Sequence, residues 1–354
     1  MEKIRVELGK RSYNIEVGAG NLFQTDFTEF NASKYAVITD SNVRGLYGDK
    51  LLELIQSQGL SAQLIEVPAG EKSKNPQLVI EIARELTRNN FDTKSIVVAV
   101  GGGVVGDLAG FVASVYKRGV RVVHVPTTLI AQVDSSIGGK TGVDLPEGKN
   151  LVGTFYQPSK VIIDVDVLKT LPKEELKNGL AEAIKYGMSQ DRELFEFLEQ
   201  NVGNTSPEYF LKLSAWCCSI KARVVEKDER ESELRKVLNY GHTVGHAIEA
   251  AENYEVAHGP AGGIGMNYEA RIAVLLGVLE KNALERQNSL IEKTGLQTKY
   301  SAKTDLVELM KRDKKNRGEK IFFVLPNAVG SVKTDGEKIA FAVDEETIRE
   351  ALKQ

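Results

Sequence analysis

Residues 96–107 read IVVAVGGGVVGD, and this stretch decides the class of fold. The apolar run at 96–100 is typical of a fully buried strand, and the glycines after it open a helical pattern. The same alternation of strand and helix recurs along the first half of the chain. The other apolar strand candidates are residues 35–40, 62–67, 120–125 and 161–165. Strands that alternate with helices predict an α/β domain with a mostly parallel, Rossmann-like sheet.

The pattern changes near residue 171, where helical periodicity takes over. Helical patterns follow at residues 174–187, 191–201, 208–226, 237–251, 261–279 and 280–293. Short strand-like pieces return only at 321–325 and 331–335, and an alternating pair at 4–8 and 13–17 predicts an N-terminal hairpin. We therefore expect an α/β domain over residues 1–170 and a mostly α-helical domain over 171–354.

The composition excludes several classes of protein. The hydrophobic content of 42% and charged content of 27% are ordinary for a soluble globular protein. The net charge of −3 gives no electrostatic footprint for nucleic acid. There is no run of about 18 apolar residues and no apolar signal core, so we expect a cytoplasmic protein without a membrane partner. The adjacent Cys217 and Cys218 are expected to be small core residues.

The glycine-rich segment contains the pattern G-x-G-x-x-G at Gly101, Gly103 and Gly106. Glycines there let the backbone approach a pyrophosphate at a helix N-terminus, which favours nucleotide binding. The dinucleotide fingerprint, however, usually occupies the first strand–helix unit and has an acidic partner about 20 residues later. This segment departs from that arrangement, so a tight turn without a ligand remains an alternative.

A second polar and glycine-rich stretch covers residues 127–150. It carries Asp134, Lys140, Lys149 and Asn150 among small residues. Its GGKT at 138–141 is similar to a phosphate loop, although the full Walker spacing is absent. A long insertion of this kind in a compact protein is more often functional than not, and a solvated surface loop is the alternative.

Three of the four histidines, His242, His246 and His258, lie within residues 238–266. A helix would place His242 and His246 on one face, and His258 follows an expected helix end before the turn pair Gly259-Pro260. Catalytic zinc typically has three protein ligands, and spacing alone favours His242 and His246 among them. Thr243 stands where an HExxH metalloprotease has glutamate. Solvated or hydrogen-bonded histidines are the alternative interpretation.

Seven segments together carry a family resemblance. They are PAGEKSK (68–74), GGGVVGD (101–107), PTTLIAQVDSSIGGKTGVD (126–144), GLAEAIKYG (179–187), RKVLNYGHTVGHAIE (235–249), HG (258–259) and MKRDKKN (310–316). Each is modest alone, but their order and spacing are specific. The sequence resembles 3-dehydroquinate synthase, of the sugar-phosphate cyclase superfamily, over essentially its whole length. The resemblance implies that residues 1–170 bind NAD+ and that residues 171–354 bind metal and substrate.

The resemblance also implies a reaction. That family converts 3-deoxy-D-arabino-heptulosonate 7-phosphate into 3-dehydroquinate and phosphate, the second step of the shikimate pathway to chorismate and the aromatic amino acids. It uses NAD+ catalytically, together with Zn2+ or Co2+, which would act as a Lewis acid on the substrate oxygens. The C5 hydroxyl is oxidised, phosphate leaves, the hydride returns, and the ring opens and recloses by an aldol step. The family also implies a homodimer.

By similarity, the metal ligands are Glu182, His242 and His258, which differs from the choice made on spacing. Lys185 lies one helical turn after Glu182. Lys221 and Arg235 are implied to face the substrate carboxylate. The groups implied around the phosphate and hydroxyls are Lys140, Asn150, Asn239, His246, Lys314 and Arg118, the last from the neighbouring subunit. Asp134 and Glu231 are implied to orient hydroxyls or waters.

The residues implied to bind NAD+ lie at strand ends and loops of the first domain. They are Asp40, Asn42, Glu71, Lys72, Gly103, Val104, Val105, Gly106, Asp107, Thr127, Thr128, Lys140, Lys149, Leu168, Lys169 and Thr170. One departure from the family lies beside a metal ligand. The family most often has Glu-Ala-Val after His-Gly, whereas Pro260-Ala261-Gly262 follows here. Pro260 is therefore expected to affect the geometry or affinity of His258.

Three other functions compete with this interpretation. The sister cyclases are 2-deoxy-scyllo-inosose synthase, 2-epi-5-epi-valiolone synthase and the amino-dehydroquinate variant. Lys221, Arg235 and Asn239 suit a carboxylated substrate, which disfavours the first two and leaves the amino variant open. A metal-dependent polyol dehydrogenase of the glycerol dehydrogenase type would accumulate NADH, and the segment DSSIGGKTGVD argues against it. A non-catalytic protein would not need Lys140, Asn150 and Lys185.

Overall fold

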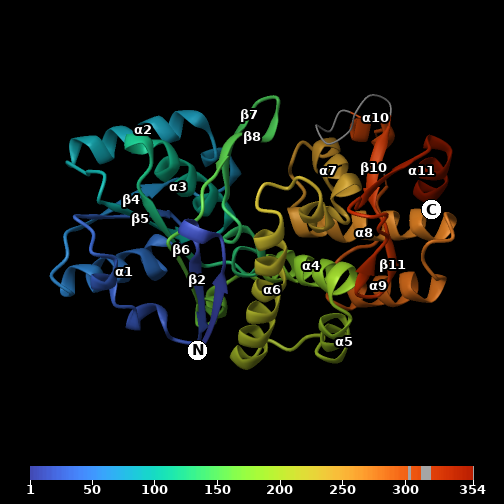
Figure 1. The fold of residues 1–354 in the computed structure, drawn as a ribbon, viewed down its shortest axis with the longest axis horizontal. Helices are drawn as coiled ribbons and strands as arrows, with labels where there is room; N and C mark the ends of the chain where they lie inside the picture. The colour runs from blue at the N-terminus through green and yellow to red at the C-terminus, as the bar shows by residue number, and fades with distance from the viewer. Residues whose placement is uncertain (302–303, 312–319, 354) are drawn as a thin grey trace. The chain divides into compact units, whose positions relative to one another are not determined.

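The structure is a computed structural model that describes residues 1–301, 304–311 and 320–353. Contacts within the chain divide it into two compact units (Figure 1). The first unit comprises residues 1–172 and 206–226, and the second comprises residues 173–205 and 227–354. The helix α6 (Pro207–Lys227) thus groups mainly with the first unit, although its sequence lies beyond residue 170.

The first unit is built on a seven-stranded sheet with the order β1-β2-β9-β6-β5-β3-β4. The strands are β1 (Glu2–Val6), β2 (Tyr13–Gly18), β3 (Tyr35–Asp40), β4 (Ala62–Val67), β5 (Ile96–Gly101), β6 (Arg121–Pro126) and β9 (Lys160–Asp164). All neighbouring pairs are parallel except the hairpin β1–β2. The predicted Rossmann-like α/β sheet is confirmed, and its strands begin and end within two residues of the predicted bounds.

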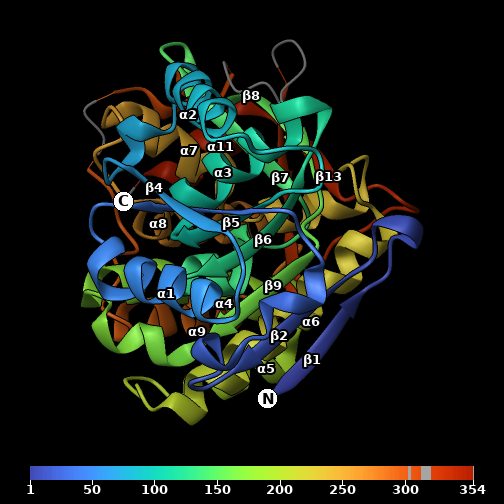
Figure 2. The same ribbon diagram turned by 90° about the vertical axis from the view of Figure 1, so that its left-hand side faces the viewer.

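Both faces of this sheet are buried, which explains the unbroken apolar runs in the central strands. Alternate residues point to opposite faces, so Ile38 and Val97 join one core cluster while Val37 and Val98 join the other. Figure 2 shows α1 (Asp49–Ser57) on one side of the sheet and α2 (Pro76–Arg88) and α3 (Gly103–Val115) on the other.

The polar stretch 127–150 is not a loop, which corrects one interpretation of the sequence. It contains the π-helix η7 (Ala131–Ser135) and the strand β7 (Lys140–Leu145), which pairs antiparallel with β8 (Gly148–Phe155). Glycine is needed where these strands cross closely, because a Cβ on Gly153 would lie 2.2 Å from the carbonyl oxygen of Thr141. The glycines that suggested a loop therefore allow two strands to approach each other.

The second unit is mostly helical. Its main helices are α4 (Lys173–Gln190), α5 (Arg192–Gln200), α7 (His242–Ala251), α8 (His258–Leu275), α9 (Lys281–Lys293), α10 (Leu306–Lys311) and α11 (Glu345–Leu352). Two antiparallel pairs accompany them, β10 (Ile321–Val324) with β13 (Ala340–Val343) and β11 (Pro326–Ala328) with β12 (Ser331–Val332). In the described part of the chain, no helix is long and apolar enough to cross a membrane.

Two helices begin more than one residue away from the predicted start. The helix expected from residue 237 begins only at His242, because Gly241 has a left-handed φ of 80° and a short 3-10 helix η9 (Leu234–Asn239) precedes it. His258 opens α8 instead of following a helix in a turn. Pro260 is tolerated in this first turn because the N–H groups there have no acceptor within the helix.

Candidate functional site

Three helices of the second unit bring a carboxylate and two imidazoles together. Glu182 projects from the middle of α4, His242 is the first residue of α7, and His258 is the first residue of α8. The Nε2 atoms of the two histidines are 3.1 Å apart. Oε1 of Glu182 lies 3.7 Å from Nε2 of His242 and 3.5 Å from Nε2 of His258. The three potential ligand atoms therefore form a compact triangle.

The other nitrogen of each imidazole has an acceptor. Nδ1 of His242 lies 3.0 Å from the carbonyl oxygen of Tyr240, and Nδ1 of His258 lies 3.4 Å from Oε2 of Glu249. A carbonyl can only accept, so Nδ1 of His242 carries the hydrogen and Nε2 keeps its lone pair. Metal-binding histidines commonly have their second nitrogen engaged in this way.

The triangle fits a tetrahedral metal. Zinc bonds of 2.0–2.1 Å at tetrahedral angles place neighbouring ligand atoms about 3.4 Å apart. The three observed separations of 3.1, 3.5 and 3.7 Å lie on either side of that value. Oε2 of Glu182 pairs with the ammonium of Lys185, so the carboxylate turns its other oxygen to the histidines. Glu182, His242 and His258 could together hold a divalent metal and leave a fourth position for another ligand.

His246 offers a second possible set, the one favoured by spacing. Ligand atoms of His242, His246 and His258 all lie within 4.8 Å of one another. The ring of His246 is 5.3 Å from that of His242 and 5.9 Å from that of His258, whereas the latter two rings are 4.8 Å apart. The ligand atoms of the three histidines are therefore farther apart than those of Glu182, His242 and His258, whose largest separation is 3.7 Å.

The charge around His258 favours a cation. Burial opposes a positive imidazole, but hydrogen bonds to the carboxylates of Glu182 and Glu249 prevail and raise the pKa of His258 to about 10. The same negative field would attract a metal ion. The start of α8 is fixed by a hydrogen bond of 2.5 Å from the backbone N–H of Gly259 to the side chain of Asn178. Pro260 is the next residue, still in the first turn of α8, where a backbone N–H would have no acceptor within the helix. Its missing N–H therefore removes no hydrogen bond of the helix.

Other predicted residues of the second unit lie near η9. Asn239 donates to Glu231 over 2.6 Å. The guanidinium of Arg235 is fully buried and donates to the carbonyl of Glu229 over 2.5 Å. Asp228, which sequence reasoning missed, accepts from three backbone N–H groups of residues 232, 233 and 235 and so shapes this turn. Lys314 lies outside the described residues.

The first unit holds another group of predicted residues. The ammonium of Lys221, on α6, donates to the carbonyl and to the carboxylate of Asp134, in each case over 2.7 Å. This ion pair is mostly buried, with 6% of the Lys221 side chain exposed. Lys140 begins β7, Asn150 lies in β8 and Arg118 follows α3, and all three are exposed. Asn150 and Arg118 have left-handed φ values of 54° and 68°.

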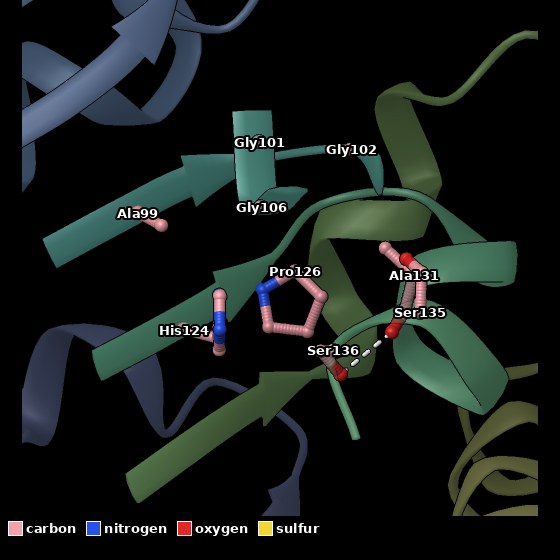
Figure 3. Close-up of a pocket in the computed structure, with 9 residues that line it drawn as sticks. All are labelled: Ala99, Gly101, Gly102, Gly106, His124, Pro126, Ala131, Ser135 and Ser136. Carbon is pink, nitrogen blue, oxygen red and sulfur yellow. Dashed lines mark hydrogen bonds between the residues drawn. The ribbon is translucent and has the colours of Figure 1, made fainter. Parts of the chain in front are cut away.

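The glycine-rich segment forms the turn from β5 into α3, as predicted. A Cβ on Gly102 would lie 2.9 Å from Cγ2 of Thr128, and one on Gly103 would lie 3.2 Å from Oγ of Ser135. The backbone at the N-terminus of α3 is thus closely packed on one side. Figure 3 shows the small pocket beneath this turn, lined by Gly101, Gly106, His124 and Ser136 among others. His124 is buried there, which lowers its pKa to about 4.

The remaining predicted cofactor residues also belong to the first unit. Asp107, in α3, forms an ion pair of 2.6 Å with Lys74. Lys74 is buried, and the sequence predicted no role for it. Burial raises the pKa of Asp107, and Lys74 opposes that rise. Asp40, at the end of β3, accepts the backbone N–H groups of Asn42 and Val43. The other predicted residues lie on short helices (Glu71, Lys72, Leu168, Lys169 and Thr170), near the start of β8 (Lys149) or directly after β6 (Thr127 and Thr128).

Comparison with solved structures defines the class of protein. The chain matches 2-deoxy-scyllo-inosose synthase, solved with carbaglucose-6-phosphate, NAD+ and Co2+, at a TM-score of 0.92 and 27% identity over 99% of each chain. It matches 2-epi-5-epi-valiolone synthase from Streptomyces hygroscopicus subsp. jinggangensis 5008, solved with NAD+ and Zn2+, at a TM-score of 0.87 and 28% identity. That match covers 98% of this chain and 97% of the other. The fold is that of the dehydroquinate synthase-like cyclases.

Sequence comparison identifies the family. The model described as 3-dehydroquinate synthase N-terminal matches residues 64–178, and the model described as 3-dehydroquinate synthase C-terminal matches residues 179–316. A 3-dehydroquinate synthase from Thermodesulfovibrio yellowstonii is 43% identical, with 100% of both chains covered. This chain belongs to the 3-dehydroquinate synthase family, which confirms the resemblance inferred from its motifs.

Proposed function

We propose that this chain converts 3-deoxy-D-arabino-heptulosonate 7-phosphate into 3-dehydroquinate and phosphate, using NAD+ catalytically and a divalent metal, Zn2+ or Co2+. The observation that carries the proposal is the triangle of Glu182, His242 and His258, with sides of 3.1, 3.5 and 3.7 Å. Membership of the family supports the reaction, and structural neighbours solved with NAD+ and Co2+ or Zn2+ support the cofactors.

In this proposal, Glu182, His242 and His258 hold the metal. When bound, the metal supplies Lewis acidity to the substrate hydroxyls that are oxidised. Lys185 neutralises the outer oxygen of Glu182 and keeps its other oxygen turned inward. His246, one helical turn after His242, is left to bind the substrate, as is Asn239, and Glu231 is assigned to orient hydroxyls or waters.

The substrate carries a carboxylate and a phosphate, and cationic side chains are the groups that recognise both. Arg235 binds the carboxylate through a guanidinium that is already desolvated, which strengthens a charge-assisted hydrogen bond. Lys221 assists at the same carboxylate, and Asp134 keeps its ammonium in position through the 2.7 Å ion pair. Lys140, Asn150 and Lys314 are assigned to the phosphate and the hydroxyls.

NAD+ is assigned to the first unit, with residues 1–170 as its binding domain and residues 171–354 as the metal- and substrate-binding domain. The N-terminus of α3 at Gly103 receives the pyrophosphate, because its free backbone N–H groups favour an anion. Asp40 ends β3, the strand next to β5, and Asn42 follows it; both are assigned to the nucleoside. The chain is further proposed to act in the cytoplasm as a homodimer in which the exposed Arg118 serves the neighbouring subunit's site.

One assay tests the reaction. Metal-loaded protein is incubated with NAD+ and the seven-carbon phosphate, and phosphate release and absorbance at 340 nm are recorded together. Stoichiometric phosphate without net NADH is the expected result, because the hydride taken up by NAD+ returns to the substrate. If NADH instead accumulates with simple alcohols and no phosphate appears, the chain is a dehydrogenase and the substrate assignments are wrong.

A further inference from the structure

The first helical turn of α7 carries His242 but lacks a cap of its own. The N-cap position is Gly241, which has no side chain to accept a hydrogen bond. A larger residue does not fit, since a Cβ on Gly241 would lie 2.6 Å from Cγ of Met266 and 3.1 Å from the carbonyl oxygen of Gly262. The N–H groups at this buried helix end therefore need an acceptor from elsewhere.

Glu269 of α8 supplies that acceptor. Its Oε2 accepts the backbone N–H of Gly241 over 2.8 Å. Its Oε1 accepts the N–H groups of Thr243 over 2.9 Å and of Val244 over 3.2 Å. An N-cap side chain normally satisfies the second or third helical N–H, and a capping-box glutamate satisfies the N-cap N–H. One carboxylate from another helix performs both tasks here, and its side chain is completely buried.

The same turn is tied to α8 at a second place. The hydroxyl of Tyr240 has two acceptors within hydrogen-bonding distance, the carbonyl of Met266 at 3.1 Å and Oε1 of Gln287 at 2.5 Å. The carbonyl of Tyr240 is the group that accepts from Nδ1 of His242. Hydrogen bonds thus connect the backbone on both sides of His242 to α8, the helix that begins with His258. In addition, α7 packs along α8 (Figure 1).

We propose that Glu269 is a positioning residue for the metal site: it fixes the start of α7, and thereby the distance from His242 to His258. This inference rests on the proposed function, because it assumes that these two histidines bind the metal. The carboxylate also lies at the positive end of the α7 dipole, which lowers the electrostatic work of placing a cation beside His242.

The test replaces Glu269 by Gln, which preserves the shape but replaces one of the two accepting oxygens by an NH2 group that faces a backbone N–H. The matched control is Glu199→Gln, because Glu199 is a half-buried carboxylate of the same unit that pairs with Arg286 over 2.6 Å. Competition with a chromophoric chelator gives the Zn2+ or Co2+ affinity of each variant. We expect the affinity of Glu269→Gln to fall by about 10–100-fold, the range typical of groups that orient metal ligands. The affinity of Glu199→Gln should stay at the wild-type value.

Activity at saturating metal separates positioning from general damage. If Glu269 acts through the metal ligands, excess metal restores kcat in Glu269→Gln. An unchanged metal affinity, or a loss of activity that excess metal does not restore, overturns the inference. Metal-free wild-type protein gives an independent check by hydrogen exchange, even where the variant does not fold. Slow exchange of the amides of Gly241, Thr243 and Val244 supports the cap, and free exchange refutes it. Failure of the wild-type protein to bind metal would instead refute the proposed function.

Discussion

Gly265→Ala is the substitution whose consequence can be worked out most closely. Gly265 lies where α8 crosses the start of α7. A Cβ there would lie 1.9 Å from the carbonyl oxygen of Gly241 and 2.8 Å from the backbone nitrogen of Gly245. These neighbours are backbone atoms, so no flexible side chain can move aside. The first turn of α7 has to retreat from α8 by about 1 Å, and such overpacking typically costs about 1–3 kcal/mol.

The net effect follows from two opposing contributions. Alanine is favoured over glycine in a helix by about 1 kcal/mol. The contact with Gly241 is closer than any real Cβ contact, so we take the upper end of the strain and expect a net loss of about 2 kcal/mol. The displaced carbonyl belongs to the residue before His242, so the 3.1 Å separation between the two imidazole nitrogens must also widen. Metal affinity should fall at least about tenfold.

Gly262→Ala is the matched control on the same helix. A Cβ on Gly262 would meet nothing within 4 Å, so only the helix preference remains and stability should rise by up to about 1 kcal/mol. Urea unfolding of the metal-free proteins, followed by circular dichroism, and chelator competition measure the two effects. If Gly265→Ala is as stable as the wild type and binds metal equally well, the close crossing of α7 and α8 does not hold His242 in place.

Four further predictions follow from the site and from the buried charges. His258→Ala should lose the metal and all turnover, whereas His246→Ala should keep its metal content and lose turnover; the reverse result in metal analysis would make His246 the ligand. Removal of the metal with a chelator should abolish phosphate release, and readdition of Zn2+ or Co2+ should restore it; phosphate release from rigorously metal-free protein would contradict the metal's role. Backbone N–H groups hold the pKa of Asp228 at about 2 against the effect of burial, so its stabilising contribution of about 2 kcal/mol should be present above about pH 4 and disappear as the pH falls to about 2. Urea unfolding at pH 7 should therefore show that loss in Asp228→Asn, and equal stabilities of variant and wild type at pH 7 would speak against it. Burial lowers the pKa of His124 to about 4, so the wild type should lose up to about 3 kcal/mol as the pH falls from about 6.5 to 4. His124→Gln should show a flatter stability profile across that interval, and an unchanged slope would mean that another group is responsible.

The sheet of the first unit could be predicted because burial on both faces leaves continuous apolar runs. Apolar segments of about six residues, such as 35–40 and 62–67, are typical of buried parallel strands. The structure has β3 and β4 at these residues. The hairpin β7–β8 was not predicted, because its glycines allow close strand crossing and look like loop residues in a sequence. The start of α8 was missed for a related reason: Gly259-Pro260 is a turn signal, yet both residues also suit the first turn of a helix.

The proposed metal-binding residues could be predicted from the sequence, but the residues that hold them in position could not. The motif match supplied Glu182, whose partner histidines follow 60 or more residues later and have no local pattern in common with it. Lys74, Asp228, Glu249 and Glu269 were not assigned roles, because a charged residue in a helical pattern usually lies on a solvated face. Their roles depend on partners from other elements, such as the start of α7 for Glu269, and only the folded chain brings those partners within hydrogen-bonding distance.

The most direct test of the central claim is anomalous diffraction from crystals of the protein loaded with Zn2+ and measured on either side of the zinc edge. The account predicts one strong peak about 2 Å from Oε1 of Glu182 and from Nε2 of both His242 and His258, with a further ligand position open. A peak bonded to His246 in place of Glu182, or no peak among these helices, would contradict it.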